Sequence, residues 1–286
     1  MESPSAPIRK EFEFTREDFD YLRKVVSDAT GIVSSEDKYT MYYSRLAARL
    51  RALGLADFRA YRDYLGKNTE TESIELINSV TTNLTSFFRE NHHFDYLRDN
   101  VIPQKRQNGE RRLRIWSAGC SSGEEAYSIA ITLQQAITDL NHWDIRILAT
   151  DIDSQVLTAA REGIYDPARI VNLDELVLKR FFAPVANDTR GRVRVDDSLR
   201  RMIQFQQLNL LHRWPMREKF DLIFCRNVII YFGAETKVEL VDRFADQLVG
   251  DGLLMMGHSE SLYRTSERFE LLGKTVYRLA ATEDKG

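Results

Sequence analysis

Two loops combine the residue types that bind a nucleoside. The first, Ser117–Glu125, carries two glycines and follows the strand-like run Leu113–Trp116. The second, Thr150–Asp153, carries two acids and follows the strand-like run Asp144–Ala149. In an open α/β sheet, glycines let the backbone approach a ligand, and an acid at the tip of the next strand accepts hydrogen bonds from ribose hydroxyls. This pairing predicts the fold class and the ligand class together.

The first loop disfavours a phosphate-bearing ligand. It has no Gly-Lys-Ser/Thr run and no G-x-G-x-x-G pattern, so neither a Walker A loop nor a nicotinamide site is expected. Glu124 and Glu125 begin the following helix, where two acids repel a pyrophosphate. S-adenosylmethionine (SAM) carries a ribose, an adenine, an ammonium and a sulfonium but no phosphate. Acid-lined loops at the ends of strands fit those groups, so SAM is the expected ligand.

Two further segments carry residues suited to this crevice. In Thr81–Glu90, a buried Phe87-Phe88 pair would direct Arg89 towards the sheet, although a polar linker is an equally good interpretation. In Cys225–Phe232, Arg226 and Asn227 follow a strand, at the end where α/β sheets bind ligands. The alternative is that Arg226 caps a helix and Tyr231 belongs to the core.

Cysteine and histidine chemistry is not expected. Cys120 lies in the first loop without a nearby base in the sequence, so we interpret it as a packing thiol. The histidines lack metal-ligand spacing, and no metal is predicted; they are His92, His93, His142, His212 and His258.

The elements that position these segments alternate between strand and helix from Leu113 onward, which predicts a mostly parallel sheet with helices on both faces. The expected helices are Glu124–Leu140, Ser154–Arg161 and Glu235–Val249. Besides the two strands above, strands are expected at Met202–Gln206, Phe220–Cys225, Leu253–Met256 and Thr275–Leu279. The alternation breaks between Tyr165 and Arg201, where we expect an insertion with a small β element.

The preceding part of the chain is expected to be an all-helical domain over residues 11–82, followed by an α/β domain over residues 83–286. Thr15 with Asp18 predicts a helix start, and Thr69 with Glu72 predicts another. The helix Glu36–Leu53 carries a basic face, which is either solvated or a docking face for an acidic protein; its arginines include Arg45, Arg49 and Arg51.

Composition limits which ligands and which cellular compartment are expected. The 286 residues carry a formal net charge of −3, so no strong field points to nucleic acid. The chain has two cysteines, which fits a reduced, cytoplasmic protein better than a disulfide scaffold. The first residues contain no apolar signal-peptide core, and the apolar runs are too short to span a bilayer. A monomer is the default expectation.

Five segments in order closely resemble the CheR family of chemotaxis receptor glutamate O-methyltransferases. They are Thr81–Glu90, Ser122–Ser128, Ala149–Asp153, Phe224–Phe232 and Gly257–Glu260. The resemblance covers about Phe19 to Leu279. It implies a class I SAM-dependent methyltransferase domain of the Rossmann-like α/β class. It also implies a small all-α domain before it and a small antiparallel β subdomain, about residues 166–201, inserted in it.

The resemblance also implies roles for individual residues. Arg89 would lie beside the transferred methyl group and Tyr231 near it. Glu125 would bind the methionine ammonium, and Asp151 the ribose. The cofactor site would also include Asn83, Thr85, Arg89, Ala118, Asn209, Leu210, Arg226 and Asn227. S-adenosylhomocysteine (SAH) would be the product, and the cytoplasmic helical domain of chemotaxis receptors the substrate.

The absence of an obvious general base agrees with this reaction. A glutamate side chain, with an ordinary pKa of about 4.3, is already a carboxylate at neutral pH and can attack a sulfonium methyl group directly. Two alternatives stay open: a methyltransferase acting on RNA or a small molecule, and a non-catalytic receptor-binding module. A nicotinamide oxidoreductase is more remote because of the loop sequence.

One segment departs from the family pattern. Some members bind a receptor's C-terminal pentapeptide through a glycine-rich loop in the β subdomain. The matching segment here, Ala183–Gly191, has a single glycine, so the sequence leaves tail binding open.

Overall fold

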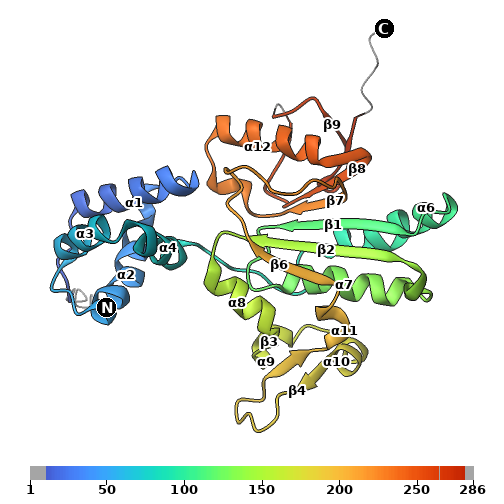
Figure 1. Ribbon diagram of the computed structural model, residues 1–286, viewed down its shortest axis with the longest axis horizontal. Helices are drawn as coiled ribbons and strands as arrows, with labels where there is room; N and C mark the ends of the chain where they lie inside the picture. Colours follow the sequence, from blue (N-terminus) through green and yellow to red (C-terminus); the bar gives the residue numbers. More distant parts are fainter. Residues whose placement is uncertain (1–10, 264, 281–286) are drawn as a thin grey trace, which may run out of the picture. The chain divides into compact units, whose positions relative to one another are not determined.

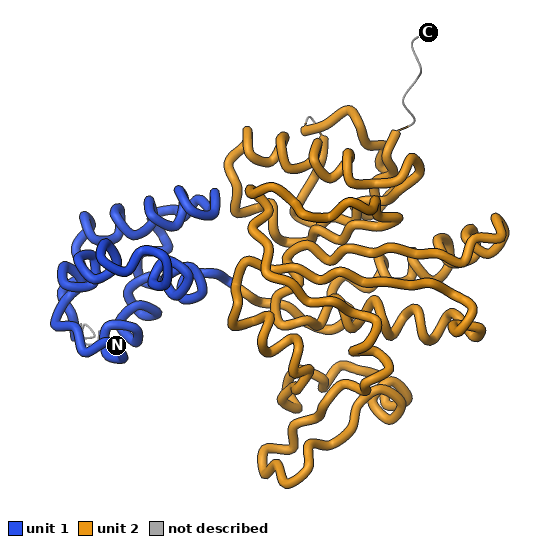
Figure 2. Tube along the Cα trace, viewed as in Figure 1, with its two compact units in different colours: residues 1–82 blue, residues 83–286 orange. Residues whose placement is uncertain are grey.

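The computed structural model describes residues 11–263 and 265–280. The chain divides after Thr82 into a smaller and a larger compact unit, shown in blue and orange in Figure 2. We call residues up to Thr82 the helical unit and residues from Asn83 the catalytic unit.

The described part of the helical unit is made of helices around an aromatic core. They are α1 (Arg16–Thr30), the 3₁₀ turn η1 (Glu36–Lys38), α2 (Tyr39–Leu53), α3 (Phe58–Lys67) and α4 (Thr69–Val80). The predicted start of α1 is confirmed, because Thr15 accepts from the backbone of Asp18 and Asp18 accepts from the backbone of Thr15. Fully buried Phe19, Tyr42 and Phe58 lie in the core of this unit.

Two local predictions for this unit were wrong. The helix expected from Glu36 begins as the η1 turn, and α2 starts only at Tyr39. Glu72 does not cap α4: the N-cap residue is Asn68, and the Glu72 carboxylate is buried. It accepts hydrogen bonds from Arg49 and from the Tyr61 hydroxyl instead. A tertiary ion pair has displaced the local capping interaction.

Seven strands of the described catalytic unit form one mixed sheet in the order β6-β2-β1-β7-β8-β10-β9 (Figure 1). The strands from β6 to β8 in this order pair in parallel, while β10 runs antiparallel to both β8 and β9. Their bounds are β1 Arg112–Ala118, β2 Asp144–Asp151, β6 Ile203–Gln207, β7 Phe220–Cys225, β8 Leu248–Met256, β9 Phe269–Gly273 and β10 Val276–Leu279. The mostly parallel sheet is confirmed, and β9 was not predicted.

Side chains of β1 alternate between two faces of the sheet, and both faces are buried from Leu113 to Ala118. Ile115 belongs to the same core cluster as Tyr127 of α7 (Glu124–Ala136). Its neighbour Trp116 packs against Phe244 of α12 (Ala234–Gln247), with ring centroids 5.4 Å apart. Helices therefore cover both faces, as predicted.

The remaining helical segments of this unit connect or flank the strands. They are α5 (His92–Tyr96), the π-helical turn η2 (Leu97–Val101), α6 (Ile102–Gln107), the 3₁₀ turns η3 (Leu140–His142) and η4 (Ile229–Tyr231), and α8 (Ser154–Glu162). The helix predicted to reach Leu140 ends at Ala136, and the segment from α5 to α6 was not predicted as helical. No described helix is both long and apolar enough to cross a membrane.

The predicted insertion is confirmed as a small antiparallel sheet between α8 and β6 (Figure 1). Its described strands are β3 (Ile164–Tyr165), β5 (Val193–Val195) and β4 (Phe182–Pro184), in that order. The short helices α9 (Pro167–Ile170), α10 (Glu175–Phe181) and α11 (Asp197–Arg200) accompany it.

Candidate functional site

The predicted site residues of the catalytic unit gather at the carboxyl edge of the parallel strands. Strand β1 lies between β2 and β7, so the chain moves from β1 to one side for β2 and to the other side for β7. This is the topological switch point at which open α/β sheets bind ligands. The loops after β1, β2, β6, β7 and β8 all leave the sheet at this edge.

The first glycine loop is held tightly against the neighbouring strand. The backbone N–H groups of Gly119 and Cys120 donate to the Thr150 carbonyl over 2.8 and 2.9 Å. Gly119 has φ of +88°, and a Cβ atom there would lie 2.3 Å from a Val228 methyl group. Only glycine fits this conformation and this contact. Ala118, directly before it, is the buried last residue of β1.

Asp151 is buried at the end of β2, beside the first loop. Its carboxylate accepts from the backbone N–H of Ser121 (2.8 Å) and of Asp153 (3.0 Å). Burial raises the pKa of Asp151 to about 6, because water no longer solvates the charged form. An acid in this state gains from additional donors such as ribose hydroxyls.

Asn83 reaches the same place from the start of the catalytic unit. Its side-chain amide donates to Asp153 over 2.7 Å, and its carbonyl accepts from the Ser121 hydroxyl over 2.8 Å. Asn83 thus lies beside both loops. Asn209 and Leu210 follow β6, where the Leu208 N–H donates to the Asp151 carbonyl over 2.9 Å. They also lie at this edge of the sheet.

Glu125 and Arg226 form a buried ion pair across the switch point. Arg226 Nη1 lies 3.0 Å from Glu125 Oε2, and Ser117 Oγ donates to Glu125 Oε1 over 2.6 Å. Burial raises the pKa of Glu125, and the Arg226 charge opposes that rise. A second cation, such as the ammonium of a ligand, would further stabilise the carboxylate.

Arg226 also holds the segment that carries Arg89. Its Nη2 donates to the Arg89 carbonyl and lies 3.5 Å from Glu90 Oε2. The alternative that Arg226 caps a helix is therefore wrong. Its buried guanidinium instead joins the loop Ser117–Glu125, the predicted cofactor loop, to the Arg89 segment.

Arg89 lies in a turn of unusual backbone geometry. Its neighbours Phe88 and Glu90 have φ of +52° and +54°, a region that side chains rarely adopt. Phe87 is buried, with its ring 4.9 Å from that of Tyr165. The Arg89 side chain is half-buried and donates to the Leu84 carbonyl over 2.9 Å. The aromatic packing and the turn, not a neighbouring strand, determine where Arg89 lies.

Arg169 was missed by the sequence analysis. From α9 of the insertion it donates to the fully buried Glu124 (2.8 Å) and to the Thr85 carbonyl (3.2 Å). Both acids at the start of α7 therefore have an arginine partner, which the sequence argument about repulsion did not foresee. No local signal in the sequence pairs Arg169 with Glu124, since they belong to different subdomains.

Asn227 and Tyr231 follow β7. Asn227 has φ of +58°, and its N–H donates to Glu260 over 2.7 Å. Tyr231 ends the η4 turn and is partly exposed, so it is not a core tyrosine. Glu260 belongs to the Gly257–Glu260 segment that the sequence analysis noted without giving it a role.

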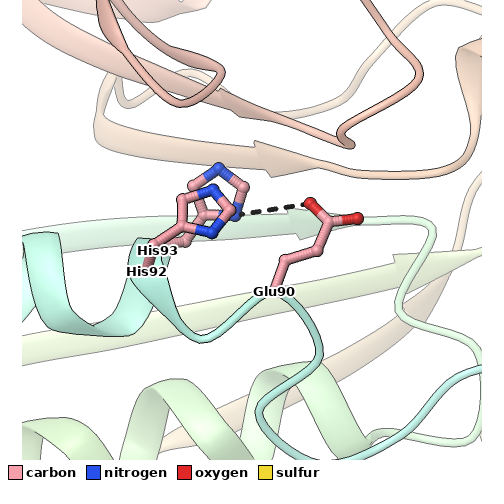
Figure 3. Close-up of side chains that lie close together, drawn as sticks. All are labelled: Glu90, His92 and His93. Atoms are coloured by element: carbon pink, nitrogen blue, oxygen red, sulfur yellow. Dashed lines mark ion pairs between the residues drawn. The ribbon is translucent and has the colours of Figure 1, made fainter.

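One described cluster has the composition of a metal site, although no metal was predicted. The possible ligand atoms of Glu90, His92 and His93 all lie within 4.8 Å of one another (Figure 3). However, the Arg226 guanidinium lies 3.5 Å from Glu90, so a divalent cation would be repelled there. Burial and Arg226 lower the pKa of His93 to about 3. We interpret the cluster as part of the Arg226 ion-pair network.

Two of the three arginines predicted to form a basic face on α2 make contacts inside the helical unit. Arg49 pairs with the buried Glu72 at 2.6 Å, and Arg45 donates to the Ser79 and Thr81 carbonyls. Arg51 is more exposed, with 58% of its side chain accessible. Arg45 and Arg49 thus have internal roles that the sequence analysis did not anticipate.

Family models match nearly the whole chain. A model described as "CheR methyltransferase, SAM binding domain" matches residues 83–278, and one described as "CheR methyltransferase, all-alpha domain" matches residues 17–81. The chain belongs to the CheR methyltransferase family. The family and the SAM cofactor predicted from the sequence are confirmed.

Curated CheR relatives match over most of their length. The Pseudomonas aeruginosa "Chemotaxis protein methyltransferase 2" is 41% identical, covering 96% of this chain and 98% of that protein. The "Chemotaxis protein methyltransferase" of Escherichia coli is 43% identical, covering 92% of this chain and 90% of that protein. The "Probable chemotaxis protein methyltransferase" of Rhizobium etli is 42% identical, covering 89% and 96%. This CheR chain is therefore a SAM-dependent chemotaxis protein methyltransferase.

Proposed function

We propose that the protein transfers the methyl group of SAM to glutamate side chains in the cytoplasmic helical domain of chemotaxis receptors, giving glutamyl methyl esters. The observation that carries the proposal is the coupling of Arg89 to the cofactor loop. Arg226 contacts both the Glu125 carboxylate and the Arg89 carbonyl. A cation that can orient an acidic substrate is thereby held next to the residues suited to the cofactor.

The donor set of the site fits SAM. Asp151 offers a buried carboxylate at the ribose position of an α/β sheet, and Glu125 offers a second one for the ammonium. The loop between β1 and α7 contains neither lysine nor arginine that would bind a phosphate. Asn83, Thr85, Ala118, Asn209, Leu210, Arg226 and Asn227 complete the proposed cofactor site.

The proposed reaction requires no general acid or base. When bound, SAM supplies a methyl group on a positively charged sulfur. Arg89 orients the incoming carboxylate through charge-assisted hydrogen bonds, and the Tyr231 hydroxyl donates to the same group. One carboxylate oxygen forms the new bond to the methyl carbon as the sulfur–methyl bond breaks, and no proton moves. Proximity, orientation and exclusion of water therefore supply the rate enhancement.

The test is methyl transfer from radiolabelled SAM to a receptor cytoplasmic fragment of the same organism. Label released as volatile methanol after alkali identifies a carboxyl methyl ester and supports the proposal. Alkali-stable label would contradict glutamate as the acceptor. Binding of SAH without transfer to any receptor fragment of that organism would favour a non-catalytic receptor-binding module.

We also propose the β subdomain as a second binding site, which would take the C-terminal tail of a receptor. The segment Ala183–Gly191 joins β4 to β5, and Asp188 in it accepts from the backbone and the guanidinium of Arg192. Calorimetric titration with the receptor's C-terminal pentapeptide decides whether this connection binds it. A peptide with its last residue removed is the control.

A further inference from the structure

The segment Gly257–Glu260 follows β8 and touches the segment that carries Tyr231. Glu260 is almost fully buried, with 3% of its surface exposed. Its Oε2 atom accepts from the backbone N–H of Asn227 and of Gly257, both at 2.7 Å. Its Oε1 atom accepts from the N–H of Val228 at 2.8 Å and of Ile230 at 3.3 Å. One carboxylate thus accepts from three backbone N–H groups of the turn between β7 and Tyr231 and from one of its own segment.

These N–H groups lie beyond the ends of strands or at the start of a 3₁₀ turn, where regular helix or strand pairing supplies no carbonyl to accept from them. Strand β7 ends at Cys225, and the short η4 turn begins at Ile229. Buried backbone donors need partners, and hydrogen bonds to a charged acceptor are stronger than those to a neutral one. The Glu260 carboxylate therefore replaces the backbone carbonyls that would accept these hydrogen bonds in a strand or a helix.

The turn is also tightly constrained by its neighbours. Asn227 has φ of +58°, in the left-handed region that asparagine adopts more readily than most residues, and Glu260 accepts from its N–H. A Cβ atom on Gly257 would lie 2.6 Å from Asn227 Nδ2 and 2.7 Å from Glu260 Oε2. Val228 fills the space against Gly119 of the cofactor loop. A shift of the turn would therefore move Tyr231 and also disturb the cofactor loop.

The same segment reaches the other proposed catalytic segment. His258 Nδ1 lies 2.9 Å from Glu90 Oε1, and Glu90 is the residue after Arg89. The segment after β8 thus contacts the neighbours of both Arg89 and Tyr231.

We infer that Glu260 is a positioning residue for methyl transfer, which fixes the turn Asn227–Tyr231 so that Tyr231 meets the acceptor carboxylate. This inference rests on the proposed function, because it uses the role given there to Tyr231. Glu260 acts through the backbone of the turn and touches neither the acceptor nor the methyl group.

The test compares Glu260→Gln with Asp221→Asn. Asp221 is a matched control: it is a buried carboxylate of the same unit that accepts from a backbone N–H, that of Arg114, at 2.7 Å. It lies near the start of β7, at the opposite end from the turn. In Glu260→Gln, an amide NH₂ group faces backbone donors and the turn loosens.

For Glu260→Gln we expect kcat for the receptor fragment to fall by about 10- to 100-fold, as misplacement of a reacting group does. Amide hydrogen exchange at Val228 and Ile230 should rise by about tenfold or more. The Kd for SAH should rise by less than kcat falls, because Asp151 and Glu125 still bind the cofactor even though the turn carries Asn227 and contacts the cofactor loop. Asp221→Asn should leave kcat and the exchange of those two amides unchanged, even where it lowers the melting temperature.

Gly257→Ala gives an independent second variant, since its Cβ atom displaces the same contacts without removing the carboxylate. It should reproduce the fall in kcat and the faster exchange. Unchanged kcat and unchanged exchange in Glu260→Gln would overturn the inference, as would equal effects in Asp221→Asn. Amide exchange is measured without a substrate, so faster exchange in the variant combined with no transfer by the wild-type protein would refute the proposed function and not the hold of Glu260 on the turn.

Discussion

Arg226 Nη1 lies 3.0 Å from Glu125 Oε2 in an ion pair that is buried on both sides. The two residues come from different strand–loop units, after β7 and after β1. Because the same guanidinium also donates to the Arg89 carbonyl, the pair ties the cofactor loop to the proposed catalytic turn. Loss of the Arg226 charge would leave Glu125 buried without a cation, and loss of the Glu125 charge would leave Arg226 with only its longer ion pair to Glu90.

Arg89→Ala should abolish methyl transfer far more than it weakens cofactor binding. The guanidinium is proposed to orient the acceptor carboxylate, so we expect kcat to fall by about 100-fold or more. The Kd for SAH, measured by calorimetry, should change by less than about threefold. Arg98→Ala is the control, since Arg98 is exposed and pairs with Asp95 and Asp99. Equal losses of transfer and of SAH binding would count against an orienting role for Arg89.

Glu125→Gln should weaken SAH binding and lower the stability of the catalytic unit. A charge-assisted hydrogen bond contributes about 1.5–3 kcal/mol, so the Kd for SAH should rise by roughly 10- to 100-fold. Glu72→Gln is the matched control, because Glu72 is also buried and paired with an arginine but belongs to the helical unit. That variant should lose stability and keep its affinity for SAH. A similar rise of Kd in both variants would contradict a direct role for Glu125.

Asp151 predicts a pH-dependent difference between the wild-type protein and Asp151→Asn. Burial raises the pKa of Asp151 from an ordinary value of 3.8 to about 6. The folded state therefore binds more protons than the unfolded state between these values, and the contribution of Asp151 to stability decreases as pH rises through this window. A rise of the pKa from 3.8 to about 6 corresponds to roughly 3 kcal/mol in the free energy of unfolding. Above about pH 6 Asp151 is ionised in both states, and its contribution to the free energy of unfolding no longer changes with pH.

Urea unfolding of both proteins from pH 4 to pH 7 measures this difference. The variant should gain stability relative to the wild-type protein as pH rises, and the gain should level off above about pH 6. Other titrating groups are common to both proteins and largely cancel. A difference that stays constant with pH would show that the pKa of Asp151 is not raised.

The arginines of α2 should separate into structural and surface residues. Arg49→Ala leaves the buried Glu72 carboxylate without a cation, although the Tyr61 hydroxyl still donates to it, and we expect the free energy of unfolding of the helical unit to fall by about 3 kcal/mol. Arg51→Ala should change it by less than about 0.5 kcal/mol, since Arg51 is exposed. Urea unfolding gives both values. Reduced receptor methylation by Arg51→Ala, with stability intact, would support a docking role for this face.

The sequence by itself determined the alternation of strands and helices that builds the parallel sheet, and the kind of ligand. Strand β7, Phe220–Cys225, lies where its sequence predicted, because a strand buried on both faces is nearly all apolar; its one charged residue, Asp221, accepts from the Arg114 N–H. The capping box at Thr15 and the glycine and acid loops after β1 and β2 were equally readable, since they depend on residues close together in the chain.

Only the tertiary structure decided which charges pair. Glu72 looked like a helix cap and is a buried partner of Arg49, and Arg226 looked like a crevice residue and joins Glu125 to the Arg89 turn. Arg169 with Glu124, and Glu260 with the turn after β7, come together from segments separated by whole helices and strands. The physical reason is that a buried charge takes its partner from whatever the packing brings within hydrogen-bond distance, and no local spacing in the sequence encodes that distance.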